Sequence, residues 1–170
     1  ISGNTITVDS TSQYLKDASY VVLQATNPRP TYAEGYNSTA TGIDAHAEGY
    51  RAVASGNASH AEGYNNVASS TASHAEGIST IASGQYSHAQ GNGSKATGNT
   101  SHAEGELTIA SGDHSHAEGS GSHAIGIASH SEGLNSIASG NHSHAEGSYN
   151  TVDGDSSHAE GNNNVVGTGF

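Results

Sequence analysis

The sequence predicts an all-β fold, a parallel β-solenoid or β-roll built from about ten stacked coils of equal length. Three observations lead to this prediction. A histidine recurs at every fourteenth position, an Ala-x-Gly string recurs half a period away, and bulky apolar residues are scarce. A fixed period of this kind is typical of a repeat protein, in which each unit stacks on its neighbours and shares one continuous core with them.

The composition favours a thin core that is repeated many times. The 170 residues include 23 Gly and a single Phe, with no Cys, Met or Trp, and Ala supplies much of the 32% apolar fraction. Ala and Gly bury too little area per residue to build a globular core of ordinary thickness. The absence of cysteine also excludes disulfide bonds and thiolate metal sites.

Residues 1–30 lack the repeat and are expected to form a separate N-terminal segment. Residues 5–8 and 19–23 have the composition of strands, and the Asn-Pro-Arg-Pro string at 27–30 separates them from the array. Two interpretations stay open for this segment. It caps the exposed edge of the solenoid, or one of its strands pairs with the open end of a neighbouring protomer and builds a filament.

The repeat array is expected over residues 31–170. A His-Ala-Glu-Gly string or a near copy recurs nine times without a slip, with Gln90 once in place of Glu and Ser131 once in place of Ala. Tyr32 occupies the histidine position of the first coil. The nine histidines are His46, His60, His74, His88, His102, His116, His130, His144 and His158.

Each coil is expected to contain two short strands that are joined by corners at the glycines, because glycine at fixed intervals marks turns. Residues 52–55 and 58–62 are typical of the two strands. A coiled coil with a seven-residue period is excluded, because it needs large apolar residues at its seam and tolerates regular glycine poorly.

Strand alternation predicts which side chains face the interior. Successive side chains of a strand point to opposite faces, so Ala54 and Ala61 should line the interior while Val53, His60 and Glu62 point outward. Outward apolar side chains would be buried by association of chains, which predicts an oligomer. The expected interface residues of this kind are Val53, Val67, Ile81, Ile109 and Ile137.

The strings Ser-His-Ala-Glu-Gly and Ala-Ser-Gly, recurring at this fixed period, resemble the head repeats of trimeric autotransporter adhesins of the YadA type, also called Hep_Hag repeats. The resemblance covers residues 31–168, and Ser-His-Ala-Ile-Gly at 122–126 is the nearest match. It implies a left-handed roll, three chains about one axis and display on a cell surface. The His-Ala-Glu-Gly variant is also similar to repeats in phage tail-fibre and spike proteins, where the array is a shaft.

The repeated histidines are the candidate metal ligands of the chain. Three imidazoles from three chains can hold a divalent transition-metal ion, and they can equally form a polar ladder with the glutamates. A position that is repeated nine times is usually dictated by packing, so the ladder is favoured. No cofactor is expected. Histidines packed as neutral rings would be destabilised by acid, whereas histidines paired with glutamate would lose their contribution as pH rises.

Tyr36, Tyr50 and Tyr64 share one position of the early coils and are also expected at an interface. Exposed tyrosines bind sugars and proteins well, but a seam between subunits is the favoured interpretation.

Several function classes are excluded by the composition. The formal net charge of -12 disfavours binding to nucleic acid, and no apolar run is long enough for direct membrane insertion. A uniform rod offers no deep pocket and no unique set of catalytic residues, so no enzyme is expected.

The predicted function is therefore that of a structural or adhesive segment of a trimeric extracellular fibre at a cell surface. Its partners would be two further copies of itself and a protein or glycan of a host surface. Three alternatives stay open: the shaft of a phage tail fibre or spike on a virion tail, a self-assembling extracellular filament, and a His-based metal-binding or pH-sensing module.

Overall fold

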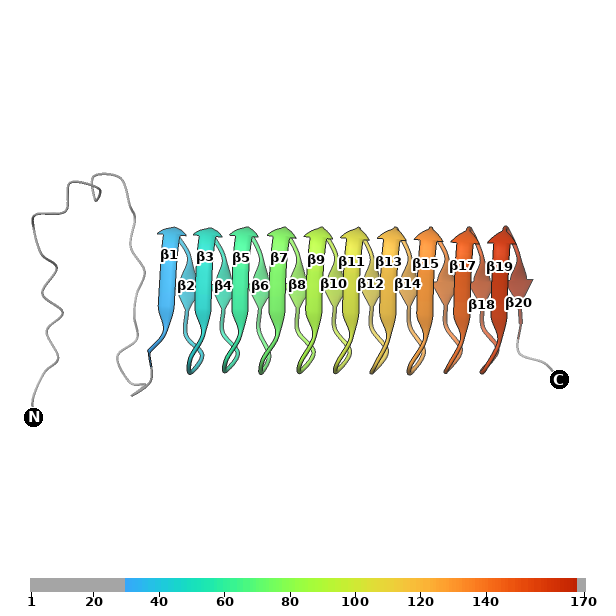
Figure 1. Cartoon of the computed structure of the whole chain (residues 1–170), viewed down its shortest axis with the longest axis horizontal. Coiled ribbons are helices and arrows are strands. Elements are labelled where there is room, and N and C mark those ends of the chain that lie inside the picture. Colours follow the sequence, from blue (N-terminus) through green and yellow to red (C-terminus); the bar gives the residue numbers. More distant parts are fainter. Residues whose placement is uncertain (1–29, 168–170) are drawn as a thin grey trace, which may run out of the picture.

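A computed structural model describes residues 30–167, which form one rod of ten coils (Figure 1). Every coil contributes one long strand and one short strand, and the two kinds of strand form two parallel ten-stranded sheets. The predicted all-β parallel solenoid of about ten fourteen-residue coils is confirmed. The expected cap or strand-exchange segment, residues 1–30, lies outside the described residues except for Pro30.

The first sheet contains the ten five-residue strands. In spatial order these are β1 (Tyr32–Tyr36), β3 (His46–Tyr50), β5 (His60–Tyr64), β7 (His74–Ile78), β9 (His88–Asn92), β11 (His102–Glu106), β13 (His116–Ser120), β15 (His130–Leu134), β17 (His144–Ser148) and β19 (His158–Asn162).

The second sheet contains the ten two-residue strands. In spatial order these are β2 (Thr39–Ala40), β4 (Val53–Ala54), β6 (Val67–Ala68), β8 (Ile81–Ala82), β10 (Lys95–Ala96), β12 (Ile109–Ala110), β14 (His123–Ala124), β16 (Ile137–Ala138), β18 (Thr151–Val152) and β20 (Val165–Val166).

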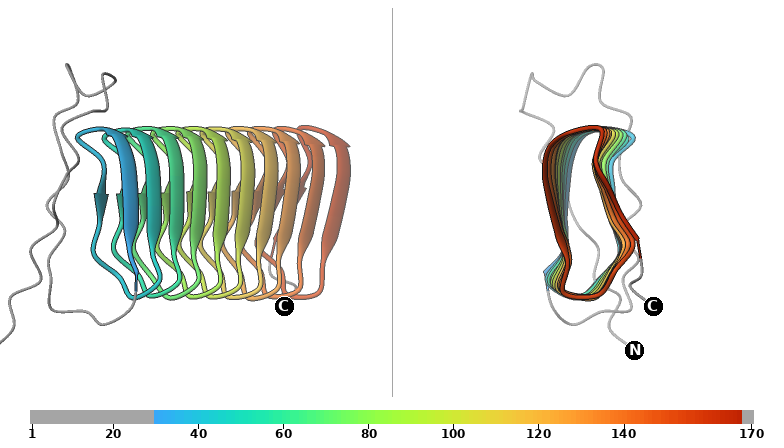
Figure 2. Two further views of the ribbon diagram at one scale, coloured as in Figure 1. Left: turned by 60° about the vertical axis from the view of Figure 1, so that its left-hand side comes forward. Right: turned by 90° about the vertical axis from the view of Figure 1, so that its right-hand side faces the viewer.

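The register between coils is constant, so equivalent residues lie directly over one another. His60 pairs with His74 and Ala61 with Ala75 between β5 and β7. All neighbouring strands of both sheets are paired with this same offset of one fourteen-residue period. The end-on view in Figure 2 shows the coils almost superposed as one flattened loop. A side chain that recurs with the period therefore forms a straight column along the rod.

The interior of the roll is filled by small side chains. The alanines that follow the repeated histidines and those of the short strands are almost all 0% exposed, as alternation predicts. The two corners add buried polar side chains that the sequence analysis did not predict. Asn66, for example, donates to Gly77 O at 2.7 Å, and its Oδ1 atom accepts from the amide of Thr80 at 2.8 Å. Ser131 fills an alanine position because its hydroxyl donates to Ser136 O at 2.8 Å.

The predicted strand limits were wrong. The long strand starts at His60, two residues later than predicted, because Ala58 has a positive φ of 53° and Ser59 donates to Gly56 O at 2.7 Å, which closes a corner. The short strand is limited to Val53 and Ala54 because Arg51, two residues before it, also has a positive φ.

The expectation that glycine forms the corners holds for only one of the two glycines of a coil: Gly56 lies at a corner, whereas Gly63 lies inside β5. The left-handed corner positions are mostly occupied by residues other than glycine, such as Arg51, Ala58 and Leu107. Glycine is required within the long strands, where the backbones of successive coils approach closely. A Cβ atom on Gly63 would lie 2.4 Å from Gly77 O of the next coil, and every coil has glycine at this position.

Replacing Leu107 by asparagine should stabilise the roll. Leu107 has a φ of 55° and is 60% exposed, while asparagine occupies the same corner position at Asn37, Asn65, Asn135 and Asn163. Asparagine tolerates the left-handed region better than leucine does, by about 0.5–1 kcal/mol. We expect the melting temperature to rise by about 2–4 °C, measured by circular dichroism. Ser111→Asn, at an exposed position without a positive φ, should give no such gain; an equal gain there would contradict the explanation.

Candidate functional site

The outer face of the first sheet carries a continuous stack of histidine rings. The nine predicted histidines each begin a long strand, so their rings lie over one another with centroids 4.6–4.9 Å apart and planes within 14° of parallel. Tyr32 takes the first position and meets the ring of His46 edge-on at 6.4 Å. All nine candidate residues are thus brought together into one column of the chain.

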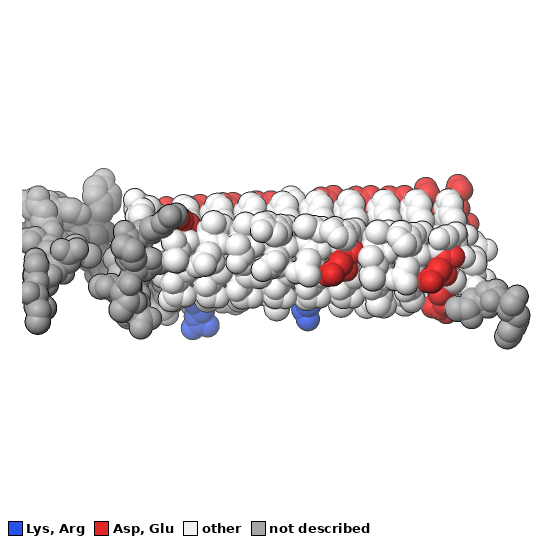
Figure 3. All heavy atoms as spheres, turned by 90° about the horizontal axis from the view of Figure 1, so that it is seen from below, with Lys and Arg blue, Asp and Glu red and all other residues white. Residues whose placement is uncertain are grey.

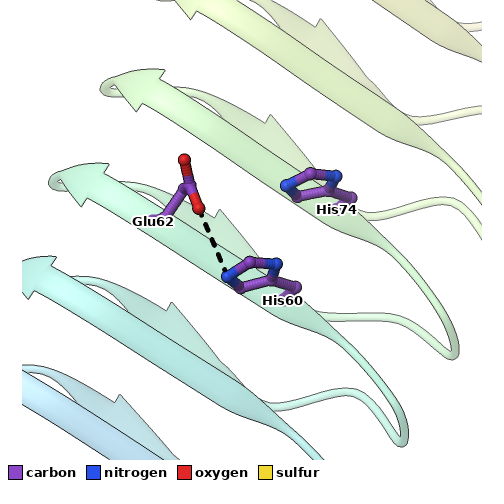
Figure 4. A group of neighbouring side chains, drawn as sticks. All are labelled: His60, Glu62 and His74. Atoms are coloured by element: carbon purple, nitrogen blue, oxygen red, sulfur yellow. Dashed lines mark ion pairs between the residues drawn. The ribbon is translucent and has the colours of Figure 1, made fainter.

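A column of glutamates runs beside the histidine stack, because each glutamate follows its histidine by two residues in the same strand. His60 Nε2 lies 3.5 Å from Glu62 Oε2, and six coils have such pairs at 3.5–3.8 Å. Figure 4 marks the pair of His60 and Glu62 with a dashed line. Gln90 is the one neutral member of this column. We call the two columns together the His–Glu face.

The Nε2 atoms of this face are shielded from solvent although the histidine side chains are only half-buried. Seven of them have no hydrogen-bond partner among the described residues: those of His60, His74, His88, His102, His116, His130 and His144. Five of the seven lie 3.5–3.8 Å from a glutamate oxygen, which is too far for a good hydrogen bond, so this row of shielded nitrogens requires an explanation.

Burial lowers the pKa of four stacked histidines below the ordinary value of 6.5. For His60, His88, His102 and His130 burial is the largest cause, and positive charge on the neighbouring histidines lowers the pKa further. The nearby glutamates act in the opposite direction but do not compensate. Of the two sequence-based interpretations, the structure therefore favours neutral, packed rings.

The glutamate column gives one edge of the rod a strong negative charge. It contains nine glutamates, and Figure 3 shows acidic side chains along one long edge, with the basic side chains visible in that view on the opposite edge. The pKa of Glu132 is raised above its ordinary value, mainly by a hydrogen bond with Glu118. Glutamates and glycines line two grooves, one at Glu34–Gly63 and one at Glu104–Gly147 along the same face.

Among the described residues, five groups of three side chains on the His–Glu face could hold a metal ion. In each group, three ligand atoms from two neighbouring coils lie within 4.8 Å of one another. The groups are His60, Glu62 and His74; His74, Glu76 and His88; His144, Glu146 and His158; Glu34, His46 and Glu48; and Glu118, His130 and Glu132.

The predicted apolar interface residues form a column on the outer face of the second sheet. Val53, Val67, Ile81, Ile109 and Ile137, which we call the aliphatic column, are each half-buried in the single chain. Lys95 and His123 interrupt the column in the same register.

The three predicted tyrosines form a second aromatic column at the ends of β1, β3 and β5. The rings of Tyr36 and Tyr50 stack at 5.0 Å, those of Tyr50 and Tyr64 stack at 4.8 Å, and the guanidinium of Arg51 lies 5.2 Å from the centre of the Tyr50 ring. Other exposed apolar residues, including Tyr86, Leu107 and Tyr149, could not be predicted from the sequence, because they occupy left-handed corner positions that share no common residue type.

No helix of the described residues is long and apolar enough to cross a membrane. Comparison with known families finds the YadA head domain repeat at residues 33–59, 82–101, 103–129, 117–143 and 131–149, which together cover more than half of the chain. No curated protein matches the sequence.

Proposed function

The chain belongs to the YadA head repeat family, and from this premise we propose that it is a rigid structural segment of a homotrimeric extracellular fibre whose seams include the aliphatic column. Heads of this family are structural adhesin domains of surface-exposed proteins and generally form homotrimers. The observation that carries the proposal for this chain is a row of valine and isoleucine side chains that its own fold leaves half-buried.

The thin core explains why this row matters. The interior consists of alanine and small polar side chains, so each coil buries little apolar area by itself. Each Å² of apolar surface that association removes from water contributes about 25 cal/mol. Packing the aliphatic columns of neighbouring chains against one another therefore supplies stability that the single roll lacks.

The charge distribution indicates which face points away from the neighbouring chains. If the His–Glu face met its copies across an axis, ladders of nine glutamates would face one another at close range. Like charges brought together in a poorly solvated interface cost several kcal/mol. The second sheet carries no such ladder, so it is the face that we assign to the seam, with the His–Glu face toward solvent.

The role of the segment follows from its shape. A rod of uniform cross-section with constant register holds a receptor-binding region at a distance from the surface, and it does so without hinges. The stacked Tyr36, Tyr50 and Tyr64 lie at the N-terminal end of the described rod, at a corner between the two sheets, where they would extend the seam. Adhesion to a host surface would then use surfaces other than these tyrosines, on this segment or elsewhere in the fibre.

Introducing charge into the aliphatic column should dissociate the trimer. We expect the complete chain to sediment as a trimer and the double variant Ile81→Glu with Ile109→Glu to sediment as a monomer, because two carboxylates per chain would have to be buried at the seam. Analytical ultracentrifugation measures this directly.

Ile127→Glu provides the matched control. Ile127 is 52% exposed and lies at a corner outside the aliphatic column, so the same change there should leave the trimer intact. A parent chain that is monomeric, or a double variant that remains trimeric, would show that the aliphatic column is not the seam.

A further inference from the structure

The His–Glu face combines three properties that belong together in a metal site. Imidazole and carboxylate groups are both present, their ligand atoms converge from neighbouring coils, and the histidine nitrogens that point toward the carboxylates lack hydrogen-bond partners. Imidazole nitrogen suits zinc and related transition metals, and two histidines with one glutamate form a known zinc-binding set. We propose that the His–Glu face binds divalent transition-metal ions of the zinc type. Each chain has two such sites, and each site consists of two histidines and one glutamate.

The first site consists of His60, Glu62 and His74, from β5 and β7. His60 Nε2 and Glu62 Oε2 are 3.5 Å apart, and two ligands of a tetrahedral zinc ion, each about 2.1 Å from the metal, lie about 3.4 Å apart. This pair therefore already has the separation that one ion requires. Figure 4 shows both atoms on the same side of the sheet, with the ring of His74 stacked directly over His60.

The third ligand requires a local movement. A ring nitrogen of His74 lies within 4.8 Å of the other two ligand atoms, so it must approach them by no more than about 1.4 Å. The side chains of His60 and His74 are 35% and 36% exposed, which leaves room for the rings to rotate out of the parallel stack. Coordination would give the Nε2 atoms the partner that they lack, and a water molecule would complete the tetrahedron.

The second site consists of His144, Glu146 and His158, from β17 and β19. It shares no residue with the first. The group of His74, Glu76 and His88 competes with the first site, because both groups contain His74. Two ions per chain is therefore the number of non-overlapping sites that contain two histidines and one glutamate.

These sites do not depend on the proposed trimer. All three ligands of each site come from one chain, and the His–Glu face points away from the assigned seam. Loss of metal binding would leave the sedimentation result unchanged, and a monomeric chain could still bind metal, so the two proposals fail separately.

The triple variant Glu62→Gln, Glu76→Gln and Glu146→Gln tests the inference; Glu76 is included because it could otherwise hold an ion together with His74 and His88. Gln90 occupies the same position in β9, so glutamine is compatible with the fold, and circular dichroism should confirm that the variant folds. In equilibrium dialysis of the complete chain against zinc chloride near neutral pH, we expect about two ions per parent chain. Removing one ligand from each site should weaken binding at least tenfold, since even the loss of a residue that only orients a ligand costs about 10–100-fold.

The matched control is Glu106→Gln with Asp113→Asn and Asp153→Asn, which removes the same charge outside the His–Glu face. This variant should bind zinc like the parent chain. The inference would be overturned by a parent chain without saturable zinc binding, by unchanged binding in the variant at Glu62, Glu76 and Glu146, or by an equal loss in the control. In each of these cases the His–Glu face would be a polar ladder only.

Discussion

Replacing Gly105 by alanine is expected to disturb the stacking of the central coils and to destabilise the roll strongly. Gly105 lies within β11 and has a φ of +107°, a conformation that residues with a side chain rarely adopt. A Cβ atom there would lie 2.1 Å from Gly119 O of the next coil. The backbone strain alone costs about 1–3 kcal/mol, and the clash can be relieved only by separating β11 from β13. We expect a loss above about 4 kcal/mol, measured by thermal or denaturant unfolding.

Gly93→Ala is the control for this substitution. Gly93 also has a positive φ, of +71°, but its Cβ atom would meet only the movable side chain of Leu107, and most other coils carry a non-glycine residue at this position. Its effect should stay within about 1 kcal/mol. Similar losses for the two variants would show that positive φ, rather than contact between coils, makes the roll depend on glycine.

Lowering the pH from about 8 to about 5.5 should destabilise the roll in a buffer that contains a metal chelator. The folded pKa values of His60, His88, His102 and His130 lie below 6.5, the value expected in the unfolded chain. Below pH 6.5 the unfolded chain therefore binds more protons than the folded one, and stability falls as pH drops through the folded pKa values. Above this window the full contribution of the neutral stack is present. Melting temperatures across this range measure the effect.

Two variants show whether the histidine stack is responsible. The double variant His88→Tyr with His102→Tyr should reduce the acid-induced loss of stability. Tyrosine is chosen because Tyr32 occupies the histidine position of the first coil. His114→Gln with His142→Gln removes two exposed histidines outside the stack and should leave it unchanged. Glu132 acts in the opposite direction: because its pKa is raised in the folded chain, its contribution to stability is present below pH 4.5 and is lost as pH rises through the folded pKa. A melting temperature that stays constant or rises between pH 8 and pH 5.5 would contradict the prediction.

Much of the candidate site could be predicted from the sequence because a periodic sequence in a constant register must form straight columns. The column of nine histidines, the neighbouring glutamates, the aliphatic column and the tyrosines at 36, 50 and 64 all follow from the regular spacing. The ring-to-ring stacking, the unpartnered Nε2 atoms and the 3.5–3.8 Å pairs do not follow from it. They depend on side-chain rotamers and on the distance between coils.

The sequence by itself determined the class of fold, the period, the number of coils and the alanine interior, because each of these is written in spacing and alternation along the chain. Only the tertiary structure decided where the strands end and why glycine is present. Ala58 and Leu107 occupy left-handed corners that local preference would assign to glycine, while Gly105 lies inside a strand. The physical reason is that residues one full period apart in sequence meet at van der Waals distance in the stacked coils. The requirement for glycine therefore comes from the neighbouring coil, and no local signal in the sequence records that contact.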